Sequence, residues 1–446
     1  MKKLNFTKSD ELFELAEKVI PGGSNKYVRK RTISGGIEIR GPKFIDHAKG
    51  SYIWDVDGNE FLDYGGMGPT ILGHGDSKVT EAVREQLKKG VVHFGLNYEL
   101  DIKLSEKMVK AIPCAEQVHM LNTGSEATTA ALRIARAYTE KAKVVKFDGH
   151  YHGIHDWTIL NLFGGNISPR LISHGLTKGA VEDTIILQWQ DLDAVERVLS
   201  NQGNEIAAVI TEPYQFNGPC IIPEKGYLEG LRKITKEHNV LLIFDEIISG
   251  FRVALGGVQE LEGVIPDIAT YGKAMANGYP ISAVASSKKI METVTYGRVF
   301  IKGTYHSNPI STSAAYATIT ELERKESYKH LNQIGDSIIK GLKDAIDDTG
   351  IDAIVQGVGP CFTIIFTEQE KIMRTSDLRA TIGVKTTSMM YPHSKRSAVF
   401  TQEMINQGIL FHPTWRNHLF LSHNIEEAFI TIEAAQKALK QTKLIE

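Results

Sequence analysis

Short apolar runs recur through the middle of the chain, separated by stretches with helical spacing. The runs are continuously apolar rather than alternating, which is typical of strands buried on both faces of a sheet. Helical segments such as 124–138, 191–200 and 225–238 can supply the crossovers of a parallel sheet. The predicted strands span residues 117–121, 143–147, 184–188, 206–211, 240–244, 267–270 and 281–286. This pattern predicts an α/β fold with a large, mostly parallel sheet flanked by helices.

The two ends of the chain follow a different pattern. Apolar residues at helical spacing occur over 9–20, and Asp57 and Gly58 interrupt an alternating pattern in 49–64, which is a hairpin signal. Beyond Pro309, the pattern predicts helices at 310–325, 328–348, 395–407 and 424–440, and short strands near 353–366 and 409–422. We therefore predict a large domain that is accompanied by a smaller α+β domain, with boundaries at 1–69 (N-terminal helix and hairpin, part of the small domain), 70–309 (large domain) and 310–446 (C-terminal small domain).

Composition narrows the classes of protein to which the chain can belong. Of its 446 residues, 42% are hydrophobic and 23% are charged, which is typical of a soluble globular protein. The formal net charge of −2 gives no electrostatic reason to expect nucleic acid or an anionic membrane as a partner. Cys114, Cys220 and Cys361 are far apart, which favours a reducing compartment over a disulfide framework. No 18 apolar residues run together and the N-terminus has no apolar segment, so we expect a cytoplasmic protein.

One lysine, Lys273, lies in the loop sequence YGKAMANGYP (271–280), which carries no other charged side chain. An exposed surface lysine is the ordinary interpretation. Asp245 directly follows a predicted strand, so it stands at the carboxyl edge of the sheet, where ligands of open α/β sheets gather. A carboxylate buried there needs a cationic partner, although an exposed carboxylate at a strand end would explain Asp245 equally well.

The segment LNTGSEATTAALRIARAYT (121–139) ends one strand and begins an alanine-rich helix. A helix N-terminus offers unpaired N–H groups and a partial positive charge, which suits a phosphate. Gly124 allows close approach of the backbone, while Ser125 and Thr123 add hydroxyl donors. The competing interpretation is an ordinary helix cap with Glu126 in the first turn.

The segment KFDGHYHGIHD (146–156) follows the next predicted strand and supports two kinds of site. Tyr151 can stack its flat face on a ring. The same segment resembles a metal-binding cluster through His150, His152 and His155. The sequence therefore leaves open a ring-binding site and a metallohydrolase site at this position.

Taken together, these segments predict one ligand. A phosphate at a helix start, an aromatic ring on Tyr151, a cationic ring nitrogen facing Asp245 and a lysine within covalent reach indicate pyridoxal 5′-phosphate. A free lysine has a pKa of about 10.4, so Lys273 needs a lowered pKa to act as a nucleophile and proton shuttle. The metallohydrolase remains the rival hypothesis, but it leaves Lys273 and Asp245 without a role.

Several motifs resemble, in order and spacing, those of class III pyridoxal-phosphate-dependent aminotransferases, and most of all those of the glutamate-1-semialdehyde 2,1-aminomutase branch. They are TGSEATTAALRIAR, KFDGHYHG, LLIFDEIISGFR, YGKAMANGYP and KGTYHSNP. The resemblance extends over most of the chain, from PGGSN (21–25) to LFLSHN (419–424). It implies a fold type I PLP-dependent transferase.

The resemblance also implies a role for each matching position. Lys273 would hold the internal aldimine and carry protons, while Asp245 would pair with the pyridine nitrogen. The remaining cofactor contacts would be Gly124 and Ser125 at the phosphate, Tyr151 and Ile247 on the two ring faces, and Gly303 and Thr304 at the phosphate of the neighbouring subunit. That last pair implies a homodimer with shared active sites. Arg29 would hold a substrate carboxylate, whereas His152 is expected to be mainly structural.

Positions on the substrate side depart from the aminomutase pattern. The segment PGGSNKYVR (21–29) differs from it, Met67 stands where a tryptophan is usual, and Arg416 is expected to lie out of register with a carboxylate site. We therefore expect first an aminotransferase that moves an amino group between a β- or ω-amino compound (an amino acid or acyl thioester) and a 2-oxo acid. The alternatives are a glutamate-1-semialdehyde 2,1-aminomutase, an epimerase on the same fold and, from another class, the metallohydrolase.

Overall fold

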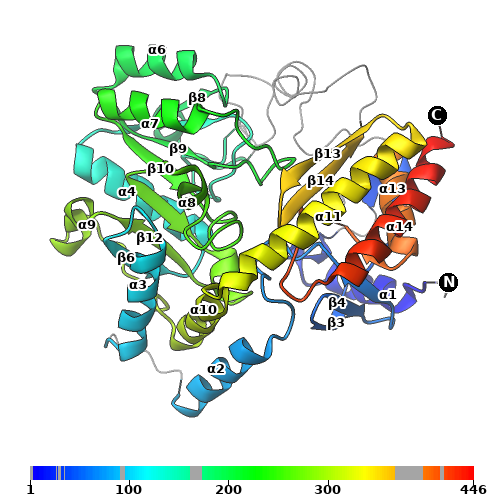
Figure 1. Cartoon of the computed structure of the whole chain (residues 1–446). Coiled ribbons are helices and arrows are strands. Elements are labelled where there is room, and N and C mark those ends of the chain that lie inside the picture. The colour runs from blue at the N-terminus through cyan, green and yellow to red at the C-terminus, as the bar shows by residue number, and fades with distance from the viewer. Residues whose placement is uncertain are drawn as a thin grey trace.

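The computed structural model describes residues 4–26, 28, 32–34, 36–90, 96–160, 173–366, 395–411 and 416–445. Within these residues, one large sheet has seven strands in the order β6-β12-β11-β10-β9-β7-β8 (Figure 1). The strands are β6 (Gln117–Leu121), β7 (Lys143–Phe147), β8 (Thr184–Leu187), β9 (Ile206–Thr211), β10 (Leu241–Asp245), β11 (Ile268–Tyr271) and β12 (Ser282–Ser286). Only β12 runs antiparallel to both of its neighbours. The predicted α/β fold with a mostly parallel sheet is confirmed.

Both faces of this sheet are covered, which explains why its strands read as continuous apolar runs. Along β10, Leu241 and Ile243 pack with α4 (Gly124–Thr139) and α9 (Lys288–Thr295) in one buried cluster. Leu242 and Phe244 belong to a second cluster on the opposite face. That second face is covered by α3 (Glu99–Ala111), α6 (Leu192–Gln202), α7 (Tyr227–Glu237) and α10 (Pro309–Leu322), joined at the edge by α2 (Ser77–Lys88). Residues two apart on a strand therefore face the same helical layer.

The two ends of the chain build the smaller sheets. One antiparallel sheet contains β13 (Ala353–Val358), β14 (Cys361–Phe366) and β16 (Asn417–His418). Another contains β3 (Ile45–Lys49), β4 (Tyr52–Asp55), β5 (Glu60–Asp63) and β15 (Ile409–Leu410). Because β5 pairs in parallel with β15, the N-terminal hairpin and the C-terminal segment are held together. A further pair is β1 (Thr32–Ser34) with β2 (Ile37–Ile39).

Helices from the same two ends flank these sheets. They are α1 (Thr7–Ala16), α11 (Lys325–Thr349), α13 (Lys395–Asn406) and α14 (Ile425–Lys443). Figure 1 shows α11 running from α10 towards the C-terminal part, where it packs beside α14. The helix expected at 9–20 ends at Ala16 instead, and Ile20 is extended because the following Pro21 disfavours helical geometry there. The boundaries drawn after residues 69 and 309 stay predictions.

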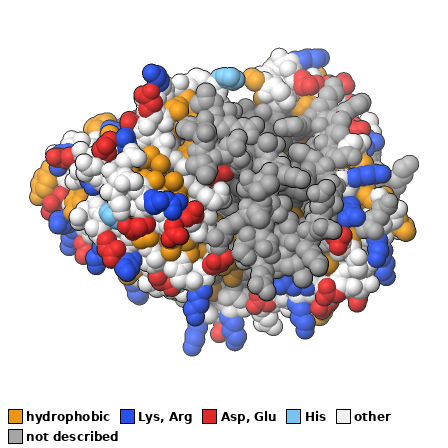
Figure 2. All heavy atoms as spheres, turned by 90° about the horizontal axis from the view of Figure 1, so that it is seen from above, with side chains coloured by type: hydrophobic (Ala, Val, Ile, Leu, Met, Phe, Trp, Pro, Cys, Tyr) orange, Lys and Arg blue, Asp and Glu red, His pale blue; other side chains and the backbone are white. Residues whose placement is uncertain are grey.

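Short helical and surface features complete the described structure. They include η1 (Pro21–Gly23), α5 (Lys178–Glu182), α8 (Val258–Glu262) and η2 (Lys273–Ala276). Charged side chains of both signs are spread over the described part of the face in Figure 2, in line with 51 basic and 53 acidic residues. Among the helices that the structure describes, none has the length and apolar character needed to cross a bilayer.

A buried arginine joins the large sheet to the smaller part of the fold. The side chain of Arg252 has no exposed surface, and burial lowers its pKa to about 10, so it stays charged at neutral pH. It donates hydrogen bonds to the carbonyl oxygens of Leu419 at 3.0 Å, Gly68 at 2.8 Å and Thr70 at 2.6 Å. One cation thus satisfies three buried carbonyls from two distant segments.

Replacing Arg252 by methionine should lower the free energy of unfolding by about 3 kcal/mol, because three buried carbonyls lose their donor. Urea titration followed by circular dichroism measures the loss. Arg252→Lys is the matched control, since a lysine keeps a cation with three donors and should lose less. A methionine variant as stable as the unaltered protein would contradict this role.

Candidate active site

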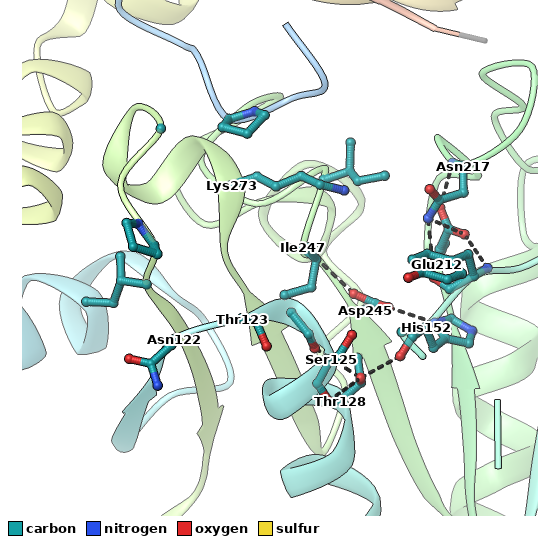
Figure 3. A pocket seen from close by; sticks show the side chains of 18 of the residues that line it. Asn122, Thr123, Ser125, Thr128, His152, Glu212, Asn217, Asp245, Ile247 and Lys273 are labelled. Carbon is teal, nitrogen blue, oxygen red and sulfur yellow. Dashed lines mark hydrogen bonds and ion pairs between the residues drawn. The ribbon is translucent and has the colours of Figure 1, made fainter. Parts of the chain in front are cut away.

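A cavity of about 310 Å³ opens where the strands of the large sheet reach their carboxyl ends (Figure 3). Its walls come from the residues that follow four parallel strands and from the start of α4. Lining residues that bear on its chemistry are Gly124, Ser125, Tyr151, His152, Glu212, Asn217, Asp245, Ile247 and Lys273. The sheet edge that gathers ligands in open α/β folds is therefore the edge that carries this cavity.

Lys273 lies in the cavity, half-buried, rather than on the surface. It begins η2 directly after β11, with a φ of 43°, in the left-handed region that non-glycine residues seldom adopt. Burial and, to a lesser extent, the positive charge of Arg416 lower its pKa to about 7, against the opposing effect of the negative charge of Asp245. Near neutral pH a large share of the Lys273 side chains is therefore uncharged and nucleophilic, as the sequence hypothesis required.

Asp245 is the last residue of β10 and is only 5% exposed. One carboxylate oxygen accepts from the Thr270 hydroxyl and the Ile247 main-chain N–H, both at 3.1 Å. The other oxygen lies 2.7 Å from Nδ1 of His152. Burial raises the pKa of Asp245 to about 6, and the hydrogen bond from Ile247 and the charge of Lys273 limit that rise. The carboxylate is thus ionised at neutral pH and fixed in direction.

His152 makes a hydrogen bond to Asp245 that the sequence did not indicate. Its ring is buried, and burial together with the charge of Lys146 lowers its pKa well below the usual value. The imidazole is therefore neutral, and its Nδ1–H donates to Asp245, as the dashed line in Figure 3 marks. We conclude that His152 positions Asp245, a role that the expectation of a mainly structural histidine missed.

The start of α4 satisfies both interpretations of its sequence. Thr123 and Glu126 form a capping box, so the helix cap that was one of the two interpretations of the sequence is present. Gly124 and Ser125 nevertheless line the cavity with the helix start. A Cβ on Gly124 would lie 3.1 Å from the Ile247 side chain, so a larger residue would crowd Ile247. The Ser125 hydroxyl accepts from the Ile154 N–H at 3.3 Å and keeps its own proton to donate.

Glu212 is a site residue that the sequence reasoning missed. It directly follows β9, whose residues are all buried, much as Asp245 ends β10, and that parallel was a usable signal. Its carboxylate accepts from the main-chain N–H groups of Tyr151 at 3.2 Å and Asn217 at 2.9 Å, and from Asn217 Nδ2 at 3.1 Å. Burial, with the negative charge of Asp245, raises its pKa to about 7. Glu212 therefore ties the main chain of Tyr151 to Asn217, and Figure 3 marks its hydrogen bonds to Asn217.

Other predicted positions lie elsewhere or have different surroundings. Gly303 and Thr304 are exposed and do not line the cavity of this chain. Arg29 lies outside the described residues. Arg416 was expected to lie out of register, but it is buried and close enough to Lys273 for their charges to interact. Arg416 does not line the cavity, so its register relative to a carboxylate site stays a prediction.

The three histidines of segment 146–156 do not converge on a metal. His150 accepts from the Glu212 main-chain N–H at 3.0 Å, whereas His152 is bound to Asp245. His155 lies 3.2 Å from the Thr128 hydroxyl instead. Across the ranges that the structure describes, no three His, Cys, Asp or Glu side chains are grouped to hold an ion. The metallohydrolase hypothesis thus loses its cluster, since each histidine is used in a separate hydrogen bond.

The low pKa of Lys273 can be measured in the cofactor-free protein. An amine-reactive acylating reagent modifies only the neutral amine, so labelling of Lys273 should reach half its maximum near pH 7. Exposed Lys178 is the internal control for labelling of a surface amine. Arg416→Met should move the Lys273 midpoint upward, because a neighbouring cation is removed. Peptide mass spectrometry at graded pH reads both sites, and a Lys273 midpoint near that of Lys178 would refute the assignment.

Comparisons with known proteins agree with this arrangement. The chain matches the family model described as Aminotransferase class-III over residues 38–434. It is 38% identical over 449 residues to the glutamate-1-semialdehyde 2,1-aminomutase of Clostridium novyi, covering 99% of this chain and 100% of that protein.

Solved structures share the fold over nearly the whole length. An omega-transaminase from Sphaerobacter thermophilus superposes with a TM-score of 0.87 and 28% identity, covering 97% of each chain. A glutamate-1-semialdehyde aminomutase from Pseudomonas aeruginosa superposes with a TM-score of 0.81 at 20% identity, covering 98% of this chain and 94% of that one. The chain therefore belongs to the class III aminotransferase family of fold type I enzymes, whose cofactor is pyridoxal 5′-phosphate.

Proposed function

We propose that this protein exchanges an amino and an oxo group within one small molecule, in the manner of a glutamate-1-semialdehyde 2,1-aminomutase. The observation that carries the proposal is a lysine amine with a pKa of about 7 beside a buried, ionised carboxylate, in a chain that aligns end to end with such an aminomutase. The substrate-side residues led us to expect first an aminotransferase for β- or ω-amino compounds, with the aminomutase as an alternative. The alignment supports the aminomutase better.

The cavity has the groups that pyridoxal 5′-phosphate needs. Gly124, where a side chain would crowd Ile247, and Ser125 would receive the phosphate at the start of α4. Tyr151 and Ile247 would contact the ring, and Asp245 would face its nitrogen. When bound, the cofactor supplies an electron sink for the carbanion that deprotonation of the substrate leaves.

The protein's own part in the chemistry is proton transfer and its control. The Lys273 amine, with a pKa of about 7, is largely available in its uncharged form near neutral pH and would take a proton from one substrate carbon and return it at another. Asp245 must stay ionised to hold a protonated ring nitrogen, and the hydrogen bond from His152 keeps it so oriented. Glu212 keeps the main chain of Tyr151 in place beside the ring.

An aminotransferase remains the second candidate. The structural match to the omega-transaminase from Sphaerobacter thermophilus favours it, because that protein shares 28% of its residues with this chain. The two candidates use the same cofactor and the same lysine. They differ in whether a separate oxo acid must accept the amino group.

We further propose a homodimer with shared sites. Gly303 and Thr304 are exposed here, as positions that serve a neighbouring subunit must be, and exposed Phe300 and Tyr305 (69% and 68%) border them. Apolar side chains so exposed are typical of surfaces that bind a partner. Arg29 is proposed to hold a substrate carboxylate, and a cytoplasmic location stays a prediction.

Activity assays with the enzyme that contains bound pyridoxal 5′-phosphate distinguish the aminomutase from the aminotransferase. Glutamate 1-semialdehyde without any oxo acid should be converted to its isomer with the amino group on the terminal carbon, detected by mass spectrometry with an isomer-specific colour reaction. Lys273→Ala should abolish this turnover, while exposed Lys178→Ala should leave it unchanged. No conversion of the semialdehyde, together with transfer from β- or ω-amino donors to pyruvate or 2-oxoglutarate, would overturn the mutase in favour of the aminotransferase. Turnover in neither assay would overturn both.

Replacing His152 by alanine should weaken cofactor binding about tenfold, because a buried charged hydrogen bond of about 1.5 kcal/mol is lost. The pKa of Asp245 should rise as well, so as the pH falls binding should begin to weaken at a higher pH than in the unaltered enzyme. Titration of the apoprotein with pyridoxal 5′-phosphate at several pH values gives both quantities. His152→Gln retains a donor and should recover part of the affinity, and an alanine variant with unaltered affinity would exclude the positioning role.

A further inference from the structure

Two cysteines that are 141 positions apart in sequence meet in the interior. Their Sγ atoms lie 3.6 Å apart, and the two side chains are 1% and 0% exposed. Cys220 belongs to the segment after β9, and Cys361 is the first residue of β14. The contact thus links the large sheet to the small antiparallel sheet, away from the residues that hold the cofactor.

The two cysteines stand on elements that continue into the cavity. Cys220 follows Asn217 by three residues, and Asn217 donates to the carboxylate of Glu212 at 3.1 Å. Cys361 pairs across the sheet with His418 of β16. Gly68 lies between His418 and Lys273, because a Cβ there would be 3.4 Å from the His418 ring and 3.2 Å from Lys273 Cδ. A movement of either sulfur is therefore transmitted to a cavity wall.

The backbone at Cys220 is held in a disfavoured conformation. Its φ of 55° lies in the left-handed region, where a residue with a Cβ is strained and where glycine or asparagine is usual. The surrounding structure keeps this geometry with isolated β-bridge pairing between Gln215 and Ile221. The strain holds the Cys220 thiol against Cys361 rather than against solvent.

We propose that Cys220 and Cys361 are a reversible oxidation site that takes a hydroperoxide and forms a disulfide, which ties the 212–221 segment to β14 and weakens cofactor binding. Neither thiol lines the cavity where a substrate would bind. Its chemistry therefore stands whether or not the aminomutase activity proposed above is found.

The chemistry balances with one hydroperoxide for two thiols. The Cys220 sulfur attacks a peroxide oxygen, the O–O bond breaks, and a sulfenic acid forms as water or an alcohol leaves. The Cys361 sulfur then attacks the oxidised sulfur, the S–S bond forms, and the hydroxyl leaves as water with the second thiol proton. Burial raises the pKa of Cys220, as does the neighbouring Cys361, while the charge of Arg416 acts in the opposite direction. The net effect is a raised pKa, so the Cys220 thiol must lose its proton as its sulfur attacks the peroxide.

Bond formation must shift the walls of the cavity. The sulfur atoms have to approach from 3.6 Å to about 2.05 Å. The interior is closely packed, so the 212–221 segment and β14 must move with their sulfurs. Because Asn217 and Glu212 hold the main chain of Tyr151, the ring contact of the cofactor is displaced.

Mass spectrometry of the purified enzyme tests the site directly. Treatment with hydrogen peroxide or an organic hydroperoxide should lower the intact mass by 2 Da, and peptide mapping should identify a bridge between residues 220 and 361. Cys114→Ala is the matched control, because Cys114 is also buried but lies against Ala285, and it should behave like the unaltered protein. Cys220→Ala and Cys361→Ala should show no loss of 2 Da.

The effect on the cavity is measured without any substrate. The dissociation constant for pyridoxal 5′-phosphate should rise about tenfold in the oxidised protein and return to its original value after dithiothreitol. Retention of both thiols under peroxide, a bridge that includes Cys114, or oxidation to sulfinic acid alone would overturn the proposal. A 220–361 bridge with unchanged cofactor affinity would overturn the link to the cavity. Because none of these readouts uses an amino substrate, failure of the aminomutase assay leaves them interpretable.

Discussion

Desolvation of charge at the carboxyl edge of the central sheet is the constraint on which the site depends. Burial disfavours the charged form of both an ammonium and a carboxylate, so it lowers the pKa of the amine and raises the pKa of the carboxylic acid. The pKa of Lys273 falls to about 7 and that of Asp245 rises to about 6, so the two pKa values become similar. One enclosed space thus keeps a nucleophilic amine and an ionised carboxylate at the same pH.

Buried basic side chains hold the loops that form this space. Lys146 has no exposed surface, and its amine donates to the main-chain carbonyls of His150 and Thr158 at 3.0 Å each. Arg252 does the same for Gly68 and Leu419 on the other side. Loops that carry site residues cannot be buried unless their carbonyls find donors, and long basic side chains supply several donors at once. The rigidity of the cavity therefore comes from hydrogen-bonded charge as much as from apolar packing.

The architecture could be predicted because its signals are local. Each predicted strand of the large sheet, including 206–211 and 240–244, formed within one residue of its expected position. Continuous apolar strands and helical spacing are direct consequences of burial on one or two faces. The positions of Asp245 and Gly124 followed from the same signals, since a strand end and a helix start are themselves local features. The choice between aminotransferase and aminomutase did not follow, because it rests on substrate contacts that several segments share.

The amino-acid pattern alone was sufficient for the sheet, the helices around it and the candidate cofactor contacts that directly follow a strand or begin a helix. Tertiary structure decided which distant side chains meet: His152 on Asp245, Arg416 beside Lys273, and Cys220 against Cys361. It also separated the histidines that looked like one metal cluster. The physical reason is that periodicity reports which face of an element is buried, whereas hydrogen bonds and pKa values depend on what the rest of the chain packs against that face.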